Sequence, residues 1–328
     1  MKIGITYDTA EMYFQDADNH LHFDFAESLS INKIKRELRN LGCTVELIGN
    51  KDDLLDLIKQ GNMDFDLIYN TVEGLNSRNR EALVPAILEA CNINYMGTDS
   101  FGLSMTLDKA LMKCLAERAG ILTPKYCLFR GRQLDEEPVR QMRNMKYPVI
   151  IKPNFEGNSS GISIGKDFES ALNTVRKLLS QYQTSILCEE FIFGQEITVP
   201  VIGNDLNHAL WGVTTVDIQT TDSFWLDVNA KVYGNYKNVI LNLSDSLKAE
   251  YFSIIQRLYT IIGCRDFARF DFRMTDDNKI YFIEANPLPA IFVGGSFDVV
   301  GRSVGYNYRQ TLQLMVNTAA DRLSIPKI

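Results

Sequence analysis

The sequence predicts a protein of mixed class, α/β at its N-terminus and α+β over the rest of the chain. Three observations predict it. The chain has 328 residues, about twice the usual length of a single domain. Strand and helix patterns alternate over residues 1–100, which is typical of a parallel sheet covered by helices. After residue 147, short strands and a helix follow one another around a Gly-rich segment and lead to a hairpin, which is typical of an α+β unit.

The first hundred residues contain the alternating elements. We expect strands at 2–6, 44–48 and 66–69, and helices at 25–41, 52–58 and 81–91. Gly42 ends the first helix, because glycine favours the left-handed conformation found after helix C-termini. A polar stretch from Asp8 to His22 makes the first strand–helix connection longer than usual. It is equally compatible with a functional loop and with a surface insertion.

The remaining residues predict two further domains. A helix begins near Thr106, with Asp108 close to its start, and ends at Gly120. We then expect strands at 147–153, 185–191, 196–203, 209–216, 267–274 and 279–286, and helices at 168–179, 246–262 and 302–323. The expected domains are an N-terminal α/β substrate domain at 1–100, a central domain with the Gly-rich loop at 101–193, and a C-terminal domain with the hairpin at 194–328.

Composition and charge exclude several classes of protein. Apolar residues make up 45% and charged residues 23%, as in folded globular chains. A net charge of -7 argues against a protein that coats nucleic acid or an anionic membrane. We expect a cytoplasmic protein, because no apolar stretch has the length of a signal peptide or a membrane span. The six cysteines include no CxxC pair and are expected to be reduced thiols.

The hairpin ARFDFRMTDDNKIYFIEAN carries the strongest chemical pattern. Side chains alternate along a strand, so Arg269 and Asp271 share one face, and Glu284 and Asn286 share one face of the next strand. Phe270, Phe272, Tyr281 and Ile283 are expected to cover the opposite face. Two carboxylates and an amide are hard oxygen ligands, which suit Mg²⁺ bound together with phosphates. The alternative is a hairpin with a solvated polar face.

Two weaker patterns precede the hairpin. Lys152 ends an apolar strand before the loop EGNSSGIS, in which Gly157 and Gly161 allow close backbone approach to phosphate oxygens. The segment CEEFIFGQE ends a strand in acids that can accept hydrogen bonds from ribose hydroxyls. Alone, the first could be an ordinary turn and the second an ordinary acidic strand end.

Together these segments resemble a known family. LDKALMK, VIIKPNFEGNSSGIS, CEEFIFGQE, the pair Ala230–Lys231, and RFDF followed by EANPLP occur in the order typical of the ATP-grasp superfamily. Within it the chain resembles the D-alanine:D-alanine ligase branch of carboxylate-amine ligases. The resemblance covers most of the chain and implies an ATP-grasp fold preceded by a parallel α/β domain. It also implies ATP-dependent amide or peptide bond formation through an acylphosphate, with ADP and phosphate as products.

The resemblance further implies ligands and partners. These are ATP, two Mg²⁺ ions for which Mn²⁺ can substitute, amino acid or small peptide substrates, and a homodimer. By the same resemblance, Lys109 and Lys152 would hold the ATP phosphates beneath a loop formed by Glu156, Gly157, Asn158, Ser159, Ser160 and Gly161. Glu189, Glu190, Phe191 and Ile192 would contact adenine, Glu196 would bind the ribose, and Asp271, Glu284 and Asn286 would bind the metal.

The catalytic and substrate residues also follow from the resemblance. Arg269 would stabilise the tetrahedral oxyanion and Lys231 would meet the transferred phosphate. Glu27 and Glu81, with Glu73 as a competitor for the second, would hold the ammonium of the first amino acid. Ser296 would bind the carboxylate of the second. Arg78 and Arg80, beside these acids, could either bind an extra carboxylate or be solvated loop residues.

The chain departs from the family pattern at the substrate contacts. The segment PLPAIFVGGSF replaces a PGMT-type sequence, so Ala290 stands in a glycine position and Ser296 lies one residue beyond the expected serine. Val232 replaces a tyrosine that often follows the lysine of the 231 loop. We therefore expect substrates other than the D-alanine pair. The alternatives are a genuine D-alanine:D-alanine ligase, an ATP-binding module without activity, and a kinase-like member that stops at a phosphorylated product.

Overall fold

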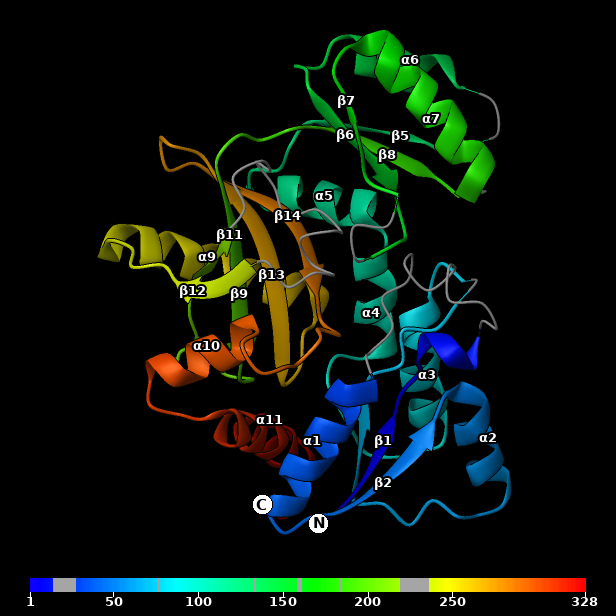
Figure 1. Ribbon diagram of the computed structural model, residues 1–328, viewed down its shortest axis with the longest axis vertical. Coiled ribbons are helices and arrows are strands. Elements are labelled where there is room, and N and C mark those ends of the chain that lie inside the picture. Colours follow the sequence, from blue (N-terminus) through cyan, green and yellow to red (C-terminus); the bar gives the residue numbers. More distant parts are fainter. Residues whose placement is uncertain (14–27, 76, 132–133, 158–160, 183, 219–235) are drawn as a thin grey trace.

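The computed structural model describes residues 1–328 apart from 14–27, 76, 132–133, 158–160, 183 and 219–235. The strands of these described residues form three sheets (Figure 1). The N-terminal sheet lies at the bottom of the view, the sheet from residues 126–190 at the top, and the sheet from residues 195–286 beside them. No helix among the described residues has the length and apolar character needed to cross a membrane.

The N-terminal sheet is parallel, as predicted, with strand order β2-β1-β3-β4. Its elements are β1 (Lys2–Thr6), η1 (Ala10–Met12), α1 (Ser28–Asn40), β2 (Thr44–Gly49), α2 (Lys51–Lys59), β3 (Leu67–Asn70), η3 (Arg80–Ala82), α3 (Leu83–Ala90) and β4 (Tyr95–Met96). Asn50 fixes the start of α2 through a capping box with Asp53. The start predicted for the first helix, at residues 25–27, lies outside the described residues.

A four-stranded antiparallel sheet of order β5-β8-β6-β7 forms the upper unit. Its elements are β5 (Tyr126–Phe129), α6 (Glu136–Arg143), β6 (Val149–Pro153), β7 (Ser163–Gly165), α7 (Phe168–Tyr182) and β8 (Ile186–Glu190). The helices α6 and α7 cover one face of the sheet (Figure 1). Buried side chains of Met142, Val175 and Ile151 form the core between the layers. The strands 147–153 and 185–191 are thus found close to their predicted bounds.

The predicted single helix from Thr106 to Gly120 is wrong at its start. Two helices, α4 (Ser100–Leu107) and α5 (Lys109–Arg118), meet at Asp108, whose extended backbone breaks the run. The Asp108 carboxylate accepts a hydrogen bond from Leu111 N and so caps α5. Gly102 weakens the helical pattern of α4, so this helix is not predicted from the sequence. A Cβ atom at position 102 would come within 2.8 Å of the Ile262 carbonyl oxygen, so the close packing requires glycine.

The third sheet is antiparallel and has the order β12-β11-β9-β13-β14, with β10 added on β9. Its elements are β9 (Gln195–Ile202), β10 (Leu210–Trp211), β11 (Thr214–Ile218), β12 (Tyr236–Ile240), α9 (Asp245–Ile262), β13 (Phe267–Met274) and β14 (Ile280–Asn286). One face packs on α9 through Tyr251, Phe270 and Phe272. The buried residues Met112 and Ala116 bring α5 into the same core.

The helical character predicted for residues 302–323 is confirmed over 308–323, but the first residues of that range belong to a separate helix. The two helices are α10 (Ser296–Ser303) and α11 (Tyr308–Leu323). Gly305, at φ +90°, turns the chain between them, and Asn307 caps α11 through a box with Gln310. The buried residues Leu312 and Met315 pack with Ile3 and Ile31. The last helix therefore contributes to the core of the N-terminal sheet, and the division at 1–100, 101–193 and 194–328 stays a prediction.

Asp266 ties three distant segments together. Its side chain is fully buried, and its carboxylate accepts hydrogen bonds from Gly97 N at 2.8 Å and Asn204 Nδ2 at 3.0 Å. Arg322 of α11 adds two more, from Nε at 2.8 Å and from NH2 at 2.7 Å. One carboxylate thus joins the end of the N-terminal domain, the third sheet and the last helix.

We expect Asp266→Ala to lower the free energy of unfolding by about 3 kcal/mol or more, because it leaves Arg322 and the Gly97 amide without their anionic partner. Denaturant unfolding measures this. The control is Asp276→Ala in the exposed turn before β14, where a change within about 0.5 kcal/mol is expected. A loss at Asp266 no larger than that of the control would contradict the role of this carboxylate.

Candidate active site

The hairpin β13–β14 brings the predicted carboxylates together. Asp271 pairs directly with Glu284, and Arg269 pairs with Asn286. All four side chains are partly exposed, whereas Phe270 and Phe272 are buried on the other face. The predicted convergence of these residues on one face is therefore confirmed.

The opposite face of β14 differs from the prediction. Ile280 and Phe282 lie in the core, in place of Tyr281 and Ile283. The register shifts between Asp271 and Phe272, so that Phe282, and not Ile283, faces Phe272. This bulge changes the parity of the strand, which lets Phe282 and Ala285 both face the core while Glu284 and Asn286 face the site.

Arg269 is bound to Asp271 two residues along the same strand. Its Nε lies 3.1 Å and 3.2 Å from the two carboxylate oxygens, and its NH2 lies 2.9 Å from Oδ2. Thr198 of β9 donates a further hydrogen bond to Asp271 Oδ1 at 3.1 Å. With its amide oxygen turned toward Arg269, Asn286 accepts from NH2 at 3.2 Å. The guanidinium is thus held among the predicted metal ligands.

A buried group of three charges lies where α5, β6 and β8 meet. The ammonium groups of Lys113 and Lys152 each lie 2.6 Å from the Glu189 carboxylate. These side chains are at most 6% exposed. Two lysines and one carboxylate therefore lie together among side chains that are almost completely buried. An anion near this lysine–glutamate triad would gain more from a lysine charge there than it would in water.

Burial and pairing act against each other in the triad. Burial lowers the pKa of Lys113, and the attraction of Glu189 does not reverse it. Burial also acts to lower the pKa of Lys152, but the negative charges of Glu189 and Glu284 outweigh it, so this pKa is raised. Burial acts to raise the pKa of Glu189, but the two lysines lower it overall. Lys152 and Glu189 are therefore charged at neutral pH.

Lys109 connects the Gly-rich loop to the hairpin. It is the first residue of α5, and its Nζ donates to the Glu156 carbonyl at 2.7 Å and lies 3.5 Å from Glu284 Oε2. Asn154, at the start of the loop, donates to Asp108 Oδ1 at 2.7 Å and accepts from Ala110 N at 3.0 Å. These bonds fix the start of α5 against the end of β6, so the lysine head is held between the loop and the metal-ligand candidates.

The Gly-rich loop is described only at its ends. Glu156 and Gly157 lie at its start, and Gly161, at φ +70°, ends it. A side chain at 161 would come within 2.9 Å of Pro153, so the turn back toward β7 needs glycine. Asn158, Ser159 and Ser160 lie outside the described residues, as do Glu27 and Lys231.

The segment predicted to contact adenine comprises the last two residues of β8, Glu189 and Glu190, and the two residues after it. Glu190 Oε1 accepts from Lys146 N at 2.9 Å, and the rings of Phe191 and Phe193 pack edge to face at 4.8 Å. Arg273 of β13 joins this segment to the third sheet, because its Nε donates to the Ile192 carbonyl at 3.1 Å. Its NH1 lies 3.6 Å from Glu196 Oε2. The segment thus lies at the junction of the two antiparallel sheets.

Arg80, which follows β3 of the N-terminal sheet, contacts the segment that begins the Gly-rich loop. Its NH1 donates to the Phe155 carbonyl at 2.6 Å, and its NH2 lies 3.4 Å from Glu81 Oε1. Both side chains are nearly buried. The sequence leaves two alternatives for Arg80, a carboxylate-binding residue or a solvated loop residue. The low exposure of its side chain contradicts the second. The guanidinium of Arg78 lies over the Phe155 ring at 5.4 Å.

Ser296 begins α10 after a segment, residues 287–295, that we call the strap. Its side chain is buried and follows Gly294 and Gly295. The strap is held by Tyr308, whose hydroxyl donates to the Ile291 carbonyl at 3.0 Å, and by Asp298, whose Oδ2 accepts from Gly294 N at 2.7 Å. Ala290 lies on the strap and is exposed. The strap leads directly from the metal-ligand candidate Asn286 to Ser296.

Comparison with known proteins agrees with this geometry. The family model described as "D-ala D-ala ligase C-terminus" matches residues 115–317, more than half of the chain. The chain belongs to this family. A D-alanine--D-alanine ligase from Actinobacillus pleuropneumoniae is 26% identical over 289 residues, which cover 88% of this chain and 91% of that protein. An uncharacterized protein, y4sG, from Sinorhizobium fredii is 24% identical over 260 residues, 78% of this chain and 75% of that protein.

Solved structures show the same fold. A D-alanine--D-alanine ligase from Bacillus anthracis aligns with a TM-score of 0.78 at 20% identity, over 99% of both chains. VanG D-Ala:D-Ser ligase from Enterococcus faecalis aligns with a TM-score of 0.72 at 19% identity, over 97% of this chain and 99% of that one. The predicted ATP-grasp fold is confirmed, and so is the class of enzyme, an ATP-dependent carboxylate-amine ligase of the D-alanine:D-alanine ligase type.

The family implies a divalent metal, and the hairpin residues fit one. Asp271 and Glu284 face each other with Asn286 beside them, which supplies the hard oxygen donors that Mg²⁺ prefers. Among the described residues, no group of three His, Cys, Asp or Glu side chains could hold a metal without other ligands. The metal would therefore complete its coordination with substrate oxygens and water, as is usual for Mg²⁺ bound with phosphates.

Two charged residues of the site were missed in the sequence. Lys113 follows Lys109 by four residues in LDKALMK, and this spacing, which places both on one side of a helix, could have indicated it. Arg273 continues the alternation of Arg269 and Asp271 along β13, so its face was predictable. Its partners were not, because Ile192 and Glu196 come from another segment of the chain.

We expect Lys113→Met to weaken ATP binding roughly 10- to 100-fold, because Glu189 would keep only Lys152 as its partner and would draw that lysine away from phosphate, and a hydrogen bond between charged groups contributes about 1.5–3 kcal/mol. Calorimetric titration with a non-hydrolysable ATP analogue measures this. Lys125→Met, at an exposed position after α5, is the control and should bind normally. Equal affinities for the two variants would exclude Lys113 from the nucleotide site.

Proposed function

We propose that this protein joins two amino-acid-like substrates by an amide bond, with activation of the first as an acylphosphate. The observation that carries the proposal is the convergence of Lys109 on both Glu284 and the Gly-rich loop. Beside it lies the buried triad of Lys113, Lys152 and Glu189. Lysine side chains can neutralise the phosphates of ATP, and the neighbouring carboxylates Asp271 and Glu284 can bind the metal ion that accompanies a triphosphate.

The reaction has two steps. A carboxylate oxygen of the first substrate attacks the γ-phosphorus of ATP, the bond to the bridging oxygen breaks, and ADP leaves. The amine of the second substrate then attacks the acyl carbon, loses a proton, and expels inorganic phosphate. Both steps need positioning and charge neutralisation more than a protein nucleophile. Mg²⁺, when bound by Asp271, Glu284 and Asn286, would neutralise phosphate charge.

In this proposal each residue has a role set by the part of the substrates that it contacts. Lys109 and Lys152 bind phosphate oxygens, and Lys231 contacts the transferred phosphoryl group. Arg269 stabilises the oxyanion that forms when the amine adds to the acyl carbon. Glu196, near Arg273, binds the ribose, and the segment Glu190–Ile192 binds adenine. Glu27, Glu81 and Ser296 bind the amino acid substrates.

We expect Arg269→Ala to lower kcat by about 10²- to 10³-fold, since losing one donor to a developing oxyanion costs about 2.7–4 kcal/mol. Steady-state ADP release measures it. Arg118→Ala, an exposed arginine at the end of α5, should retain normal turnover. An Arg269→Ala variant with near-normal kcat would remove Arg269 from the mechanism.

We further propose that the substrates differ from the D-alanine pair. The strap supports this, because Ala290 stands where the family has glycine and Phe292 and Val293 are partly exposed beside it. Arg80, held against Glu81, adds a cation at the N-terminal side of the site. Ala290 and Arg80 lie in segments that carry proposed substrate contacts, Ser296 and Glu81. The second candidate, a genuine D-alanine:D-alanine ligase, is favoured by the names of the relatives, including the one from Actinobacillus pleuropneumoniae.

A substrate panel separates the two candidates. ADP release is measured with each D- and L-amino acid alone and in pairs, and the products are identified by mass spectrometry. We expect the fastest turnover from a pair other than two D-alanines. Strong and exclusive formation of D-alanyl-D-alanine would reject the altered-substrate proposal and leave the ligase activity intact.

A further inference from the structure

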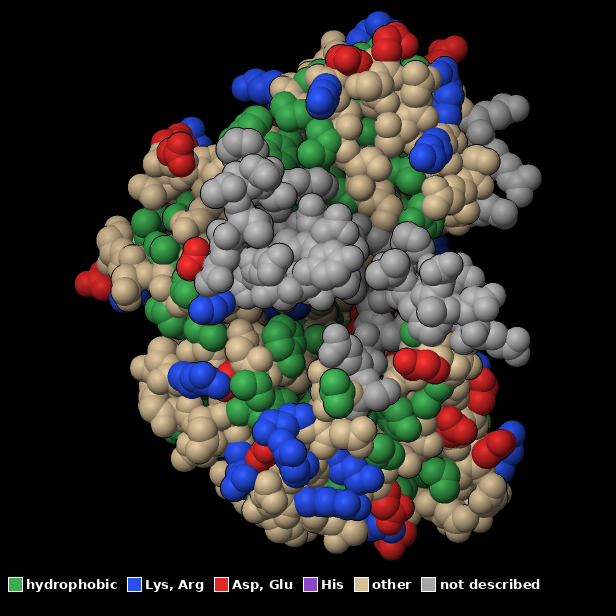
Figure 2. Space-filling model, viewed as in Figure 1, with side chains coloured by type: hydrophobic (Ala, Val, Ile, Leu, Met, Phe, Trp, Pro, Cys, Tyr) green, Lys and Arg blue, Asp and Glu red, His purple; other side chains and the backbone are tan. Residues whose placement is uncertain are grey.

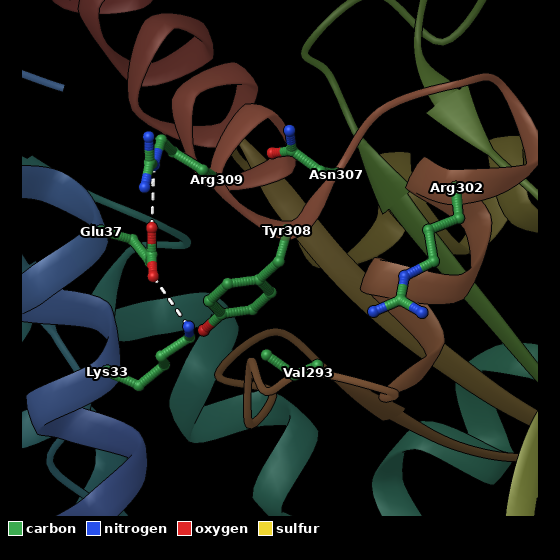
Figure 3. A pocket seen from close by; sticks show the side chains of 7 residues that line it. All are labelled: Lys33, Glu37, Val293, Arg302, Asn307, Tyr308 and Arg309. Carbon is green, nitrogen blue, oxygen red and sulfur yellow. Dashed lines mark hydrogen bonds and ion pairs between the residues drawn. The ribbon is translucent and has the colours of Figure 1, made fainter. Parts of the chain in front are cut away.

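A basic pocket lies between α1, α10 and the start of α11, next to the strap (Figure 3). Its volume is about 360 Å³. The residues that line it are Lys33, Glu37, Val293, Arg302, Asn307, Tyr308 and Arg309. None of them is among the residues proposed to bind ATP, metal or amino acid. Figure 2 shows Lys and Arg side chains gathered over α1 and α11 on this face of the molecule.

Glu37 holds two of the cations in place. Its carboxylate lies 2.7 Å from Lys33 Nζ and 2.8 Å from Arg309 Nε, so it joins α1 to α11 (Figure 3). The hydrogen bonds from Lys33 and Arg309 lower the pKa of Glu37 to about 2. The carboxylate therefore stays ionised, and it orients both cations. Their side chains remain 33% and 43% exposed, so each can contact a ligand as well.

The pocket has an excess of positive charge. Lys33, Arg302 and Arg309 line it against the single carboxylate of Glu37, which leaves a net charge of +2. Two neighbours outside the lining, Arg36 beside Glu37 and Asp298 beside Arg302, add one positive and one negative charge and leave this sum unchanged. This local charge stands out in a chain of net charge -7. Cations held by packing and pairing before a ligand arrives favour an anion, because less side-chain ordering is needed on binding.

The volume and the lining residues of the pocket limit the size and the polarity of a ligand that could bind there. A volume of about 360 Å³ is at the lower end of small-molecule sites and exceeds what a monatomic ion needs. Tyr308 and Val293 supply an apolar wall, and Asn307 supplies an amide. We propose that this pocket binds a small oxyanion with at least two negative charges, either a phosphate compound or a polycarboxylate.

The pocket is connected to the strap through two of its own residues. Arg302 NH2 lies 2.8 Å from Asp298 Oδ2, the same fully buried atom that accepts from Gly294 N. Tyr308 holds the Ile291 carbonyl. An anion that draws Arg302 away leaves the buried Asp298 carboxylate without its cation, and this carboxylate also holds Gly294, two residues before Ser296. Occupancy of the pocket thus changes the position of the proposed second-substrate contact, a consequence that rests on the proposed function.

Binding is tested on the full chain without ATP or amino acids, by calorimetric titration with inorganic phosphate and, separately, with citrate. We expect one site per chain for at least one probe in the wild type and in Arg36→Gln. Arg36→Gln removes a charge beside Glu37 that does not line the pocket. Arg302→Gln should weaken binding at least 10-fold. Tighter phosphate binding identifies a phosphate compound, and tighter citrate binding identifies a polycarboxylate.

Lys33→Gln is a second variant, because it lies on α1 and does not contact Asp298. It should also weaken binding at least 10-fold while the melting temperature shows a folded protein. Binding that is absent, or equal in all four proteins, overturns the proposal. Phosphate that binds as a product at the active site would be unaffected by Arg302→Gln and Lys33→Gln, so this outcome also counts against the pocket.

The link to catalysis is tested with the amine substrate found in the panel. Saturating the pocket should change its KM at least threefold in the wild type and in Arg36→Gln, but not in Arg302→Gln. An unchanged KM in the wild type overturns the link. The binding titrations contain no substrate, so they decide on the pocket even if the proposed function fails.

Discussion

The register of the hairpin β13–β14 is the constraint on which the site depends. It sets Asp271 opposite Glu284, and a slip of β14 by one residue would turn Glu284 toward the core. The bulge at Ile283 maintains this register while Phe282 fills the core between Phe272 and α9. From Glu284 the arrangement extends to Lys109, and through the Glu156 carbonyl to the Gly-rich loop. A packing requirement on one face of the sheet thus positions the chemistry on the other.

The bulge is also connected to the buried lysines. Thr123 donates to the Phe282 carbonyl at 2.9 Å and accepts from Lys113 at 3.1 Å. Lys113 in turn pairs with Glu189 and so with Lys152. The core, the hairpin and the lysines of the triad are therefore parts of one bonded arrangement. An acidic chain can present positive charge locally because each cation is fixed by a specific partner. The basic pocket beside α11 follows the same rule, with Glu37 as the partner.

The sequence predicts local features of this structure well and long-range ones poorly. Alternation along β13 predicts the shared face of Arg269 and Asp271, because strand geometry has a period of two residues. The bulge is missed because Tyr281, Phe282 and Ile283 are three apolar residues in a row, so the change of phase cannot be read from the sequence. Asp108 is recognised as lying near a helix start, but α4 is missed because Gly102, which its packing requires, weakens the helical pattern. The pairing of Glu189 with Lys113 and Lys152 depends on three elements meeting, and no local pattern records it.

The central claim is that the carboxylate of the first substrate is activated as an acylphosphate. Hydroxylamine tests it most directly, because it attacks acylphosphates and leaves stable phosphate esters intact. The protein is incubated with ATP, Mg²⁺ and the first substrate, with hydroxylamine in place of the second. The account predicts one hydroxamate for each ADP released. ADP release with a stable phosphorylated product and no hydroxamate would contradict it and would indicate a kinase.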